Sequence, residues 1–230
     1  MKWIRIPVIV HVSASKPNKP GYYAIHLDDY DIQAELTATT RCGFQRYTFP
    51  QDREGARVLV DLHIPTEYDY VLSDIEIKKV GPNRIEGVSH QLSRNVWSND
   101  ADQDYRLYFV LEFDQPIQEM GGWTDGTVVK TEHLTGKDLK DAGLFLQFDV
   151  KQNPTVQVRS GISLVSLENA SLNLKTEISD PFGWSFDAVR DHQQAIWNEL
   201  FGRVEISTTD RQEKVRFYNN CLLYTSPSPR

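Results

Sequence analysis

The chain has 230 residues, a formal net charge of -7 and 40% hydrophobic residues. This length and apolar content suffice for one large folded domain or two small ones, and they argue against a disordered chain. The acidic balance disfavours a nucleic-acid-binding protein, because the longest run of positive charge is the pair Lys78 and Lys79. No apolar stretch approaches the ~20 residues that cross a bilayer, so no membrane span is predicted.

Residues 1–20 form an N-terminal segment whose authenticity the sequence leaves open. Basic residues precede an apolar run at 6–12, which is the order found in a secretory signal peptide. The run is short and contains Pro7 and His11. A β-strand or a mis-started reading frame is therefore favoured over a signal peptide.

Residues 21–165 are predicted to form an antiparallel β-sandwich. Apolar and polar residues alternate in IQAELTAT (32–39), RVLVDL (57–62) and LFLQFDV (144–150), which is the period of a half-buried strand. YRLYFVLEF (105–113) is apolar on nearly both faces, as expected for a central strand that is covered on both sides. Turn signals separate such runs about every ten residues, and this spacing favours a sandwich.

The pattern changes near residue 166, and residues 166–220 are predicted to be helical. SLENASLNLKTE (166–177) reads as a short helix. A longer amphipathic helix is predicted between Ser185, a suitable N-cap, and Gly202, a suitable stop. Its apolar residues recur at helical spacing: Phe186, Val189, Ile196, Trp197 and Leu200. The predicted fold class is thus mainly β, an antiparallel β-sandwich followed by a C-terminal linker helix.

Cys42 lies between the strand predicted at 32–39 and another predicted at 44–49, where Gly43 would give the turn its flexibility. A catalytic cysteine needs a neighbouring base or a helix N-terminus to lower the pKa of its thiol. No histidine lies near Cys42 in the sequence. A buried or strand-edge cysteine is therefore favoured over a nucleophile.

Long segments of the chain resemble one enzyme family. They are PGYYAIHLDDYDIQAELTATTRCGFQRYTFP (20–50), NVWSND (95–100), YFVLEFDQPI (108–117), VRSGISLVSLENASLNL (158–174) and GWSFDAVRDHQQAIWNELFGRVEI (183–206). With these segments, in this order, the chain resembles the N-terminal part of glycoside hydrolase family 92, the calcium-dependent exo-α-mannosidases. The resemblance covers about residues 20 to 220.

The resemblance implies a β-sandwich followed by a linker helix and a large (α/α)6 barrel. The barrel would supply the catalytic acid, the catalytic base and most calcium contacts, and cleavage would invert the anomeric centre. Inversion requires two carboxyl groups roughly 6.5–9.5 Å apart with a water molecule between them. The chain would then be a truncated fragment that packs on a missing barrel and is inactive alone. Calcium would belong to the parent enzyme and not to this fragment, and the parent would be a bacterial secreted or periplasmic protein that acts on mannose-containing glycans.

The chain departs from the family pattern at both ends. A glycine-rich motif resembling G-H-x-F-P-G-A is expected upstream of residue 20 and is absent. The tail CLLYTSPSPR (221–230) has no apolar period and no relation to the family. Its codons can be written as one frame of a sequencing adapter, so the tail is interpreted as adapter read-through, with a disordered natural tail as the alternative.

The candidate carbohydrate-binding residues are Trp97, Asn99, Asp100 and Trp123, all assigned to loops. Exposed tryptophan faces stack on sugar C–H surfaces, although the favoured alternative is that each tryptophan caps the sandwich core. No catalytic residue and no metal ligand is assigned.

Two acidic clusters are interpreted as polar turns. Asp100, Asp102 and Asp104 have the spacing of a calcium loop, but they lack its glycine and its glutamate, which favours a solvated hairpin. Asp28 and Asp29 are adjacent, so in an extended segment they would point in opposite directions and would not act as a pair.

Two further functions stay open from the sequence. One is a free-standing carbohydrate-binding module, and the other is a purely structural scaffold whose apolar face would be covered by a partner.

Overall fold

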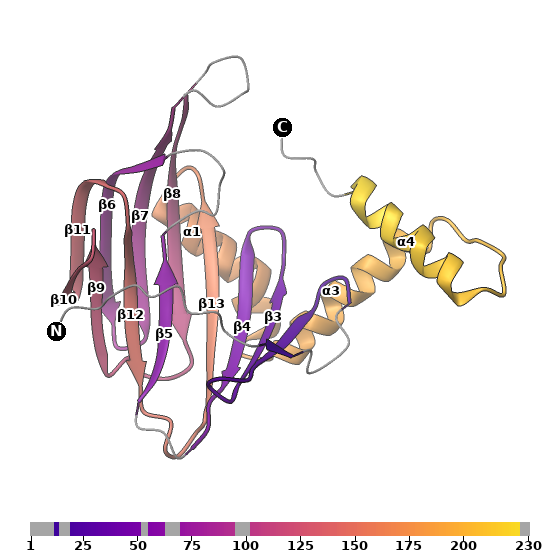
Figure 1. Ribbon diagram of the computed structural model, residues 1–230, viewed down its shortest axis with the longest axis horizontal. Helices are drawn as coiled ribbons and strands as arrows, with labels where there is room; N and C mark the ends of the chain where they lie inside the picture. The colour runs from indigo at the N-terminus through magenta and orange to yellow at the C-terminus, as the bar shows by residue number, and fades with distance from the viewer. Residues whose placement is uncertain (1–11, 14–18, 52–54, 63–69, 95–101, 226–230) are drawn as a thin grey trace.

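The computed structural model of the chain describes residues 12–13, 19–51, 55–62, 70–94 and 102–225 (Figure 1). Within these residues the strands form two antiparallel sheets, so the predicted mainly-β fold with antiparallel strands is confirmed. In spatial order, the larger sheet consists of β1 (Val12–Ser13), β2 (Tyr23–Leu27), β3 (Ile32–Ala38), β4 (Cys42–Thr48), β13 (Thr155–Ser163), β8 (Gln103–Phe113), β7 (Arg84–Ser93), β6 (Tyr70–Gly81) and β11 (His133–Leu139). The smaller sheet consists of β10 (Thr127–Lys130), β9 (Glu119–Thr124), β12 (Ala142–Phe148) and β5 (Ala56–Asp61).

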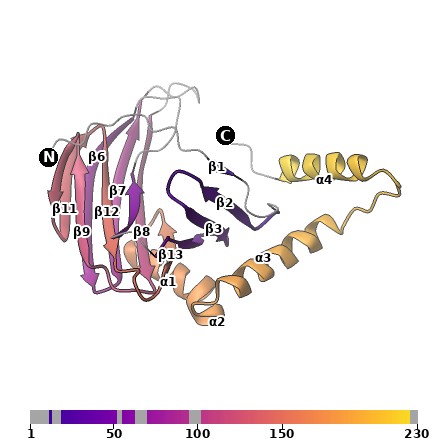
Figure 2. The ribbon, with the colours of Figure 1, turned by 60° about the horizontal axis from the view of Figure 1, so that its bottom comes forward.

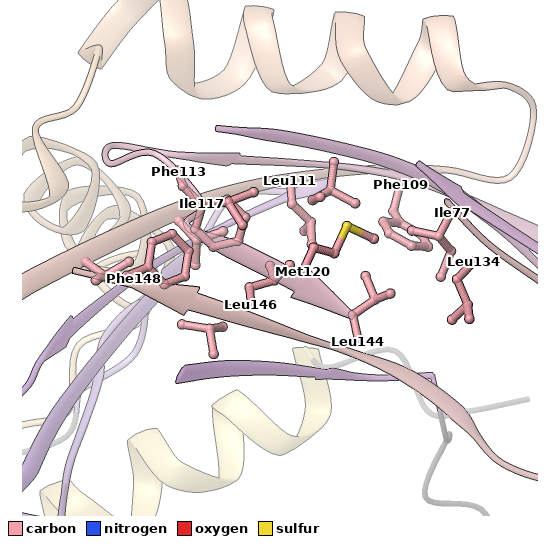
Figure 3. Packing of buried hydrophobic residues seen from close by; sticks show 14 of the residues in the cluster. Ile77, Phe109, Leu111, Phe113, Ile117, Met120, Leu134, Leu144, Leu146 and Phe148 are labelled. Carbon is pink, nitrogen blue, oxygen red and sulfur yellow. The ribbon is translucent and has the colours of Figure 1, made fainter. Parts of the chain in front are cut away.

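The hydrophobic core lies between the two sheets. Alternate residues of β12 point into it, so Leu144, Leu146 and Phe148 are buried as their period predicts. Figure 3 shows these side chains and Met120 of the smaller sheet facing Phe109 and other residues of the larger sheet. The two-sheet sandwich is therefore held by side chains from both layers.

A second buried cluster lies on the other face of the larger sheet, under the helices. It joins sheet residues such as Phe44 and Val110 to helix residues such as Leu174, Ile178 and Phe186. Strand β8 contributes Phe109 to the first cluster and Val110 to the second, so this strand is covered on both sides as predicted. The described residues thus form three layers: the smaller sheet, the larger sheet and the helices.

The helices begin where the sequence predicts. Ser166 caps α1 (Leu167–Leu174) by accepting a hydrogen bond from the Asn169 backbone, and Ser185 caps α3 (Phe186–Phe201) by accepting one from Ala188. A π-helical turn, η1 (Lys175–Ser179), and a short helix, α2 (Asp180–Phe182), connect α1 to the turn before α3.

Helix α3 leads away from the sandwich. Figure 2 shows it running outward from the sheets toward α4 (Arg211–Thr225). The Phe201 and Tyr218 rings of the two helices lie 5.8 Å apart, centre to centre. None of the described helices is long and apolar enough to cross a membrane.

Two details of the predicted strands are wrong. Gly43 lies within β4 and not in the turn, because the strand begins at Cys42. A Cβ at Gly43 would come within 2.8 Å of the Ser160 hydroxyl on the paired strand β13, so the glycine serves close strand approach. In β3, the polar residues Glu35 and Thr37 are buried rather than solvated, because Tyr22 and α3 cover that face.

Candidate functional site

A polar cleft of about 450 Å³ lies where the larger sheet meets the start of α3. Its wall is built by β3, β4 and β13 on one side and by the turn before α3 on the other. The lining residues include Glu35, Arg46, Gln157, Trp184 and Asp187. The cleft is therefore formed jointly by the sandwich and the helical segment.

Arg46 is the central cation of this cleft. Its Nε donates to Glu35 at 2.8 Å, and its two terminal nitrogens each donate to one oxygen of Asp187 at 3.3 Å. The Tyr22 hydroxyl also donates to Glu35, at 2.6 Å. Burial, followed by the Glu35 carboxylate, raises the pKa of Tyr22 to about 12. Both carboxylates are thus engaged with one guanidinium, and Arg46 fixes α3 to the sheet.

A second arginine, Arg159 of β13, is more deeply buried, with 7% of its surface exposed. Its terminal nitrogens donate to Glu112 at 2.6 Å and to the Gly183 carbonyl at 2.8 Å. Its guanidinium also lies over the Trp184 ring. Arg84 shares the Glu112 carboxylate and donates to Ser171 of α1 at 2.7 Å. This network links the sheet to α1 and to the turn before α3.

A third contact holds the η1 turn to the β3–β4 turn. Glu177 accepts hydrogen bonds from the Thr39 hydroxyl, the Arg41 backbone at 3.0 Å and the Arg41 side chain at 2.7 Å. Burial opposes the charged carboxylate, but these hydrogen bonds from Thr39 and Arg41 prevail and lower the pKa of Glu177.

Cys42 lies beside this contact and is buried, with 4% of its surface exposed. Burial and the nearby Glu177 charge raise the pKa of the Cys42 thiol to about 12. A thiol with so high a pKa is a poor nucleophile, so the geometry agrees with the predicted buried cysteine.

The predicted carbohydrate-binding residues fall into two groups. Trp97, Asn99 and Asp100 lie outside the described residues. Trp123 is described, and its assignment to a loop is wrong because it lies on strand β9. The pair Gly121-Gly122 before it also lies within the strand, where neighbouring side chains occupy the space of a Cβ. A role of Trp123 in carbohydrate binding stays a prediction.

The acidic clusters are engaged locally. Asp28 and Asp31 bond the two ring nitrogens of His26 at 2.9 and 3.0 Å in the turn between β2 and β3. Asp104 pairs with His90 on the neighbouring strand, and Asp102 lies 3.7 Å from the Arg94 side chain. In the part of the chain that the structure describes, no three His, Cys, Asp or Glu side chains are grouped so as to hold a metal ion.

Family models match two consecutive segments of the chain. The model of the glycosyl hydrolase family 92 N-terminal domain matches residues 11–163, and the model of the family 92 catalytic domain matches residues 169–228. The first match alone spans more than half of the chain. The chain belongs to glycoside hydrolase family 92. The first match ends with β13, and the second begins within the first turn of α1. The Arg46, Arg159 and Glu177 contacts of this family 92 protein therefore join the sandwich to the helical segment matched as catalytic domain.

Solved family 92 structures share the fold. An inverting mannosidase of the family from Bacteroides thetaiotaomicron aligns with a TM-score of 0.75 and 24% identity over 96% of this chain. An α-mannosidase of the family from the same organism aligns with a TM-score of 0.70 and 22% identity over 86%. A further family 92 glycosyl hydrolase aligns with a TM-score of 0.68 and 25% identity over 87%.

This family 92 chain spans about a quarter of those structures, covering 26% or 27% of each. Among curated proteins, no sequence matches it. The division of the chain at residues 20, 165 and 220, with an adapter-derived tail, stays a prediction.

Proposed function

We propose that this chain is the sandwich and the first helices of an inverting, calcium-dependent exo-α-mannosidase that hydrolyses mannose-containing glycans. The observation that carries the proposal is the order of the two family matches, an N-terminal domain at 11–163 followed by a catalytic domain at 169–228. The fold likeness to family 92 mannosidases supports it. We assign the calcium ligands, the acid and the base to parts of the enzyme outside this chain.

The role of the sandwich in this proposal is to hold the start of the catalytic domain. Arg46 fixes α3 to the larger sheet through Asp187, and Arg159 fixes the turn before α3 through the Gly183 carbonyl. Arg84 fixes α1 through Ser171. Hydrogen bonds from a charged guanidinium are stronger than neutral ones. Farther along the helical segment, Ile196, Val204 and Val215 are about half exposed. We expect the rest of the catalytic barrel to cover these apolar side chains.

The same geometry supports the proposal that the chain has no hydrolytic activity alone. An inverting hydrolase needs a proton donor and a base with a water molecule between them. At the junction, Glu35, Glu112, Glu177 and Asp187 are each hydrogen-bonded to an arginine. Carboxylates held in this way act as structural anions and not as a free acid and base.

An activity assay on two proteins tests the proposal. The 230-residue chain and the product of the gene extended beyond codon 220 are each incubated with an α-linked mannobiose. We expect mannose release by the extended product, loss of release after calcium is chelated, and no release by the chain. Turnover by the purified chain, or an inactive, folded extended product, contradicts the proposal.

Carbohydrate binding by the sandwich itself is a second candidate function. It is favoured by two partly exposed aromatic side chains, Trp123 and Phe145, which lie on the outer face of the smaller sheet.

A further inference from the structure

The outer face of the smaller sheet carries two aromatic rings, each lying over a glycine of the neighbouring strand. A Cβ built on Gly143 would lie 2.1 Å from Trp123 Cζ2, and a Cβ built on Gly121 would lie 2.2 Å from Phe145 Cζ. The rings therefore occupy the space that side chains at these two positions would fill. Each ring thus packs against the backbone of the strand beside it.

Strand register places these four residues on one face. Trp123 lies directly opposite Gly143, and Gly121 lies directly opposite Phe145. Leu144, between Gly143 and Phe145, points into the core, so its two neighbours face outward. Trp123 and Phe145 are diagonal neighbours, and such positions are roughly 7–8 Å apart between backbones. The two rings therefore lie next to each other on one surface.

The Trp123 ring is fixed in this orientation. Its Nε1–H donates to the Asp141 carboxylate at 3.0 Å. The Asp125 carboxylate in turn accepts hydrogen bonds from the Lys140 and Asp141 backbones, both at 2.9 Å, and so holds the segment that carries Asp141. A ring that is held by a hydrogen bond and packed against the neighbouring strand loses little further freedom when a ligand binds to it.

Apolar side chains extend this surface along the sheet. Leu59 of β5 lies opposite Phe145 and is 66% exposed, and Val128 of β10 lies opposite Trp123 and is 37% exposed. Asp61 of β5 lies opposite Gly143, and Asp141 accepts the hydrogen bond from Trp123 Nε1. The face thus combines an aromatic and apolar centre with acidic residues at its margin.

We propose that this face is a carbohydrate-binding platform on which Trp123 and Phe145 stack against pyranose rings of a glycan. A pyranose presents C–H groups on its flat face and hydroxyl groups around its edge. The flat, preordered rings match the C–H face, and the marginal carboxylates match the hydroxyl edge. A protein partner fits this surface less well, because side chains in the core of a protein–protein interface interlock with those of the partner.

The platform lies on the opposite side of the larger sheet from the helices, since the smaller sheet covers one face and α1 covers the other (Figures 1 and 2). A glycan bound there leaves the sandwich–helix junction free. The platform would hold substrate-like polymer without taking part in cleavage. The platform proposal depends on the proposed function in one respect, which is that mannan is chosen as the probe.

Affinity electrophoresis of the 230-residue chain through gels containing soluble α-mannan tests the platform. We expect mannan to retard the wild-type chain, and we expect Trp123→Ala and Phe145→Ala to weaken the apparent affinity at least tenfold. Tyr23→Ala is the matched control, because Tyr23 is an aromatic residue of the larger sheet that is 46% exposed. This variant should migrate as the wild type does.

A merely structural role for the rings, covering the glycines beneath them, makes a different prediction. Leu59→Glu separates the two roles, because Leu59 is exposed and its replacement leaves both rings on their glycines. We expect this variant to keep the wild-type unfolding midpoint and to lose several-fold in mannan affinity. Unretarded wild-type chain, or retardation unchanged in folded Trp123→Ala and Leu59→Glu variants, overturns the platform. Those outcomes leave mannose release by the extended gene product unaffected, so they are distinct from failure of the proposed mannosidase.

Discussion

The guanidinium carbon of Arg159 lies 3.8 Å from the centre of the Trp184 ring. Arg159 belongs to the last strand of the sandwich and Trp184 to the turn that starts α3, so this cation–π contact crosses the boundary between the two family matches. Together with the hydrogen bonds to Glu112 and Gly183, it makes the sandwich and the first helices one packed body.

Replacement of Arg159 by alanine is expected to lower the free energy of unfolding by about 3 kcal/mol, because removing one partner of a buried ion pair leaves the other uncompensated. Arg84 still contacts Glu112, which limits the loss. Chemical denaturation followed by tryptophan fluorescence measures the change. Arg57→Ala, at an exposed position of β5, is the control and should change the stability by less than about 0.5 kcal/mol. An Arg159→Ala variant as stable as this control would show that the Arg159 network does not stabilise the fold.

Replacement of Gly143 by alanine is expected to destabilise the smaller sheet by about 1–3 kcal/mol, as for an overpacked site. The new methyl group would meet both the Trp123 ring and the Val60 carbonyl, which lies 2.6 Å away. Thermal unfolding measures the loss. Gly81→Ala serves as the control, since its nearest neighbour is 3.9 Å away, and it should unfold near the wild-type temperature. Equal midpoints for the two variants would mean that the ring does not lie over Gly143.

Glu177 is expected to contribute to acid sensitivity. The pKa of Glu177 is lower in the folded state, so the unfolded state binds more protons. The ionised Glu177 side chain therefore stabilises the fold at pH values above its ordinary pKa of 4.5. This stabilisation is lost as the pH falls through the lower, folded-state pKa. Glu177→Gln should therefore reduce the dependence of unfolding free energy on pH below 4.5. Exposed Glu199→Gln should retain the wild-type dependence, and an unchanged slope in Glu177→Gln would contradict the assignment.

Cys42 is expected to resist alkylation in the native state. In a Cys221→Ser background, iodoacetamide at pH 8 should leave the native chain unmodified, because burial raises the pKa of the Cys42 thiol to about 12. In denaturant, the same chain should be alkylated within the reaction time that leaves the native chain unmodified. Rapid labelling of the native chain, read by intact-mass spectrometry, would show that Cys42 is accessible and ionised.

Periodicity predicted the strands well where one face meets the core. Leu144, Leu146 and Phe148 alternate with outward residues, and β8 is apolar on both faces because it is covered by the smaller sheet and by α1. The predicted cap Ser185 also marks the start of α3. These features depend on neighbours along the chain, which a sequence displays directly.

Contacts between distant residues could not be predicted in the same way. Glu35 looked like a solvent-facing residue of β3, but Arg46 and Tyr22 satisfy its carboxylate and allow it to be buried. The glycines before Trp123 are typical of a loop, but Trp123 lies on strand β9. Position 143 requires glycine because the Trp123 ring, which belongs to a different strand, occupies the space of a Cβ there. Such pairings depend on strand register, and no local pattern encodes them.

The proposed inverting α-mannosidase is tested most directly by a ¹H NMR time course of α-linked mannobiose hydrolysis by the extended gene product. Inversion predicts that β-mannose appears first and then mutarotates. Release of α-mannose first, or no mannose from a folded protein supplied with calcium, would contradict the proposed inverting mannosidase.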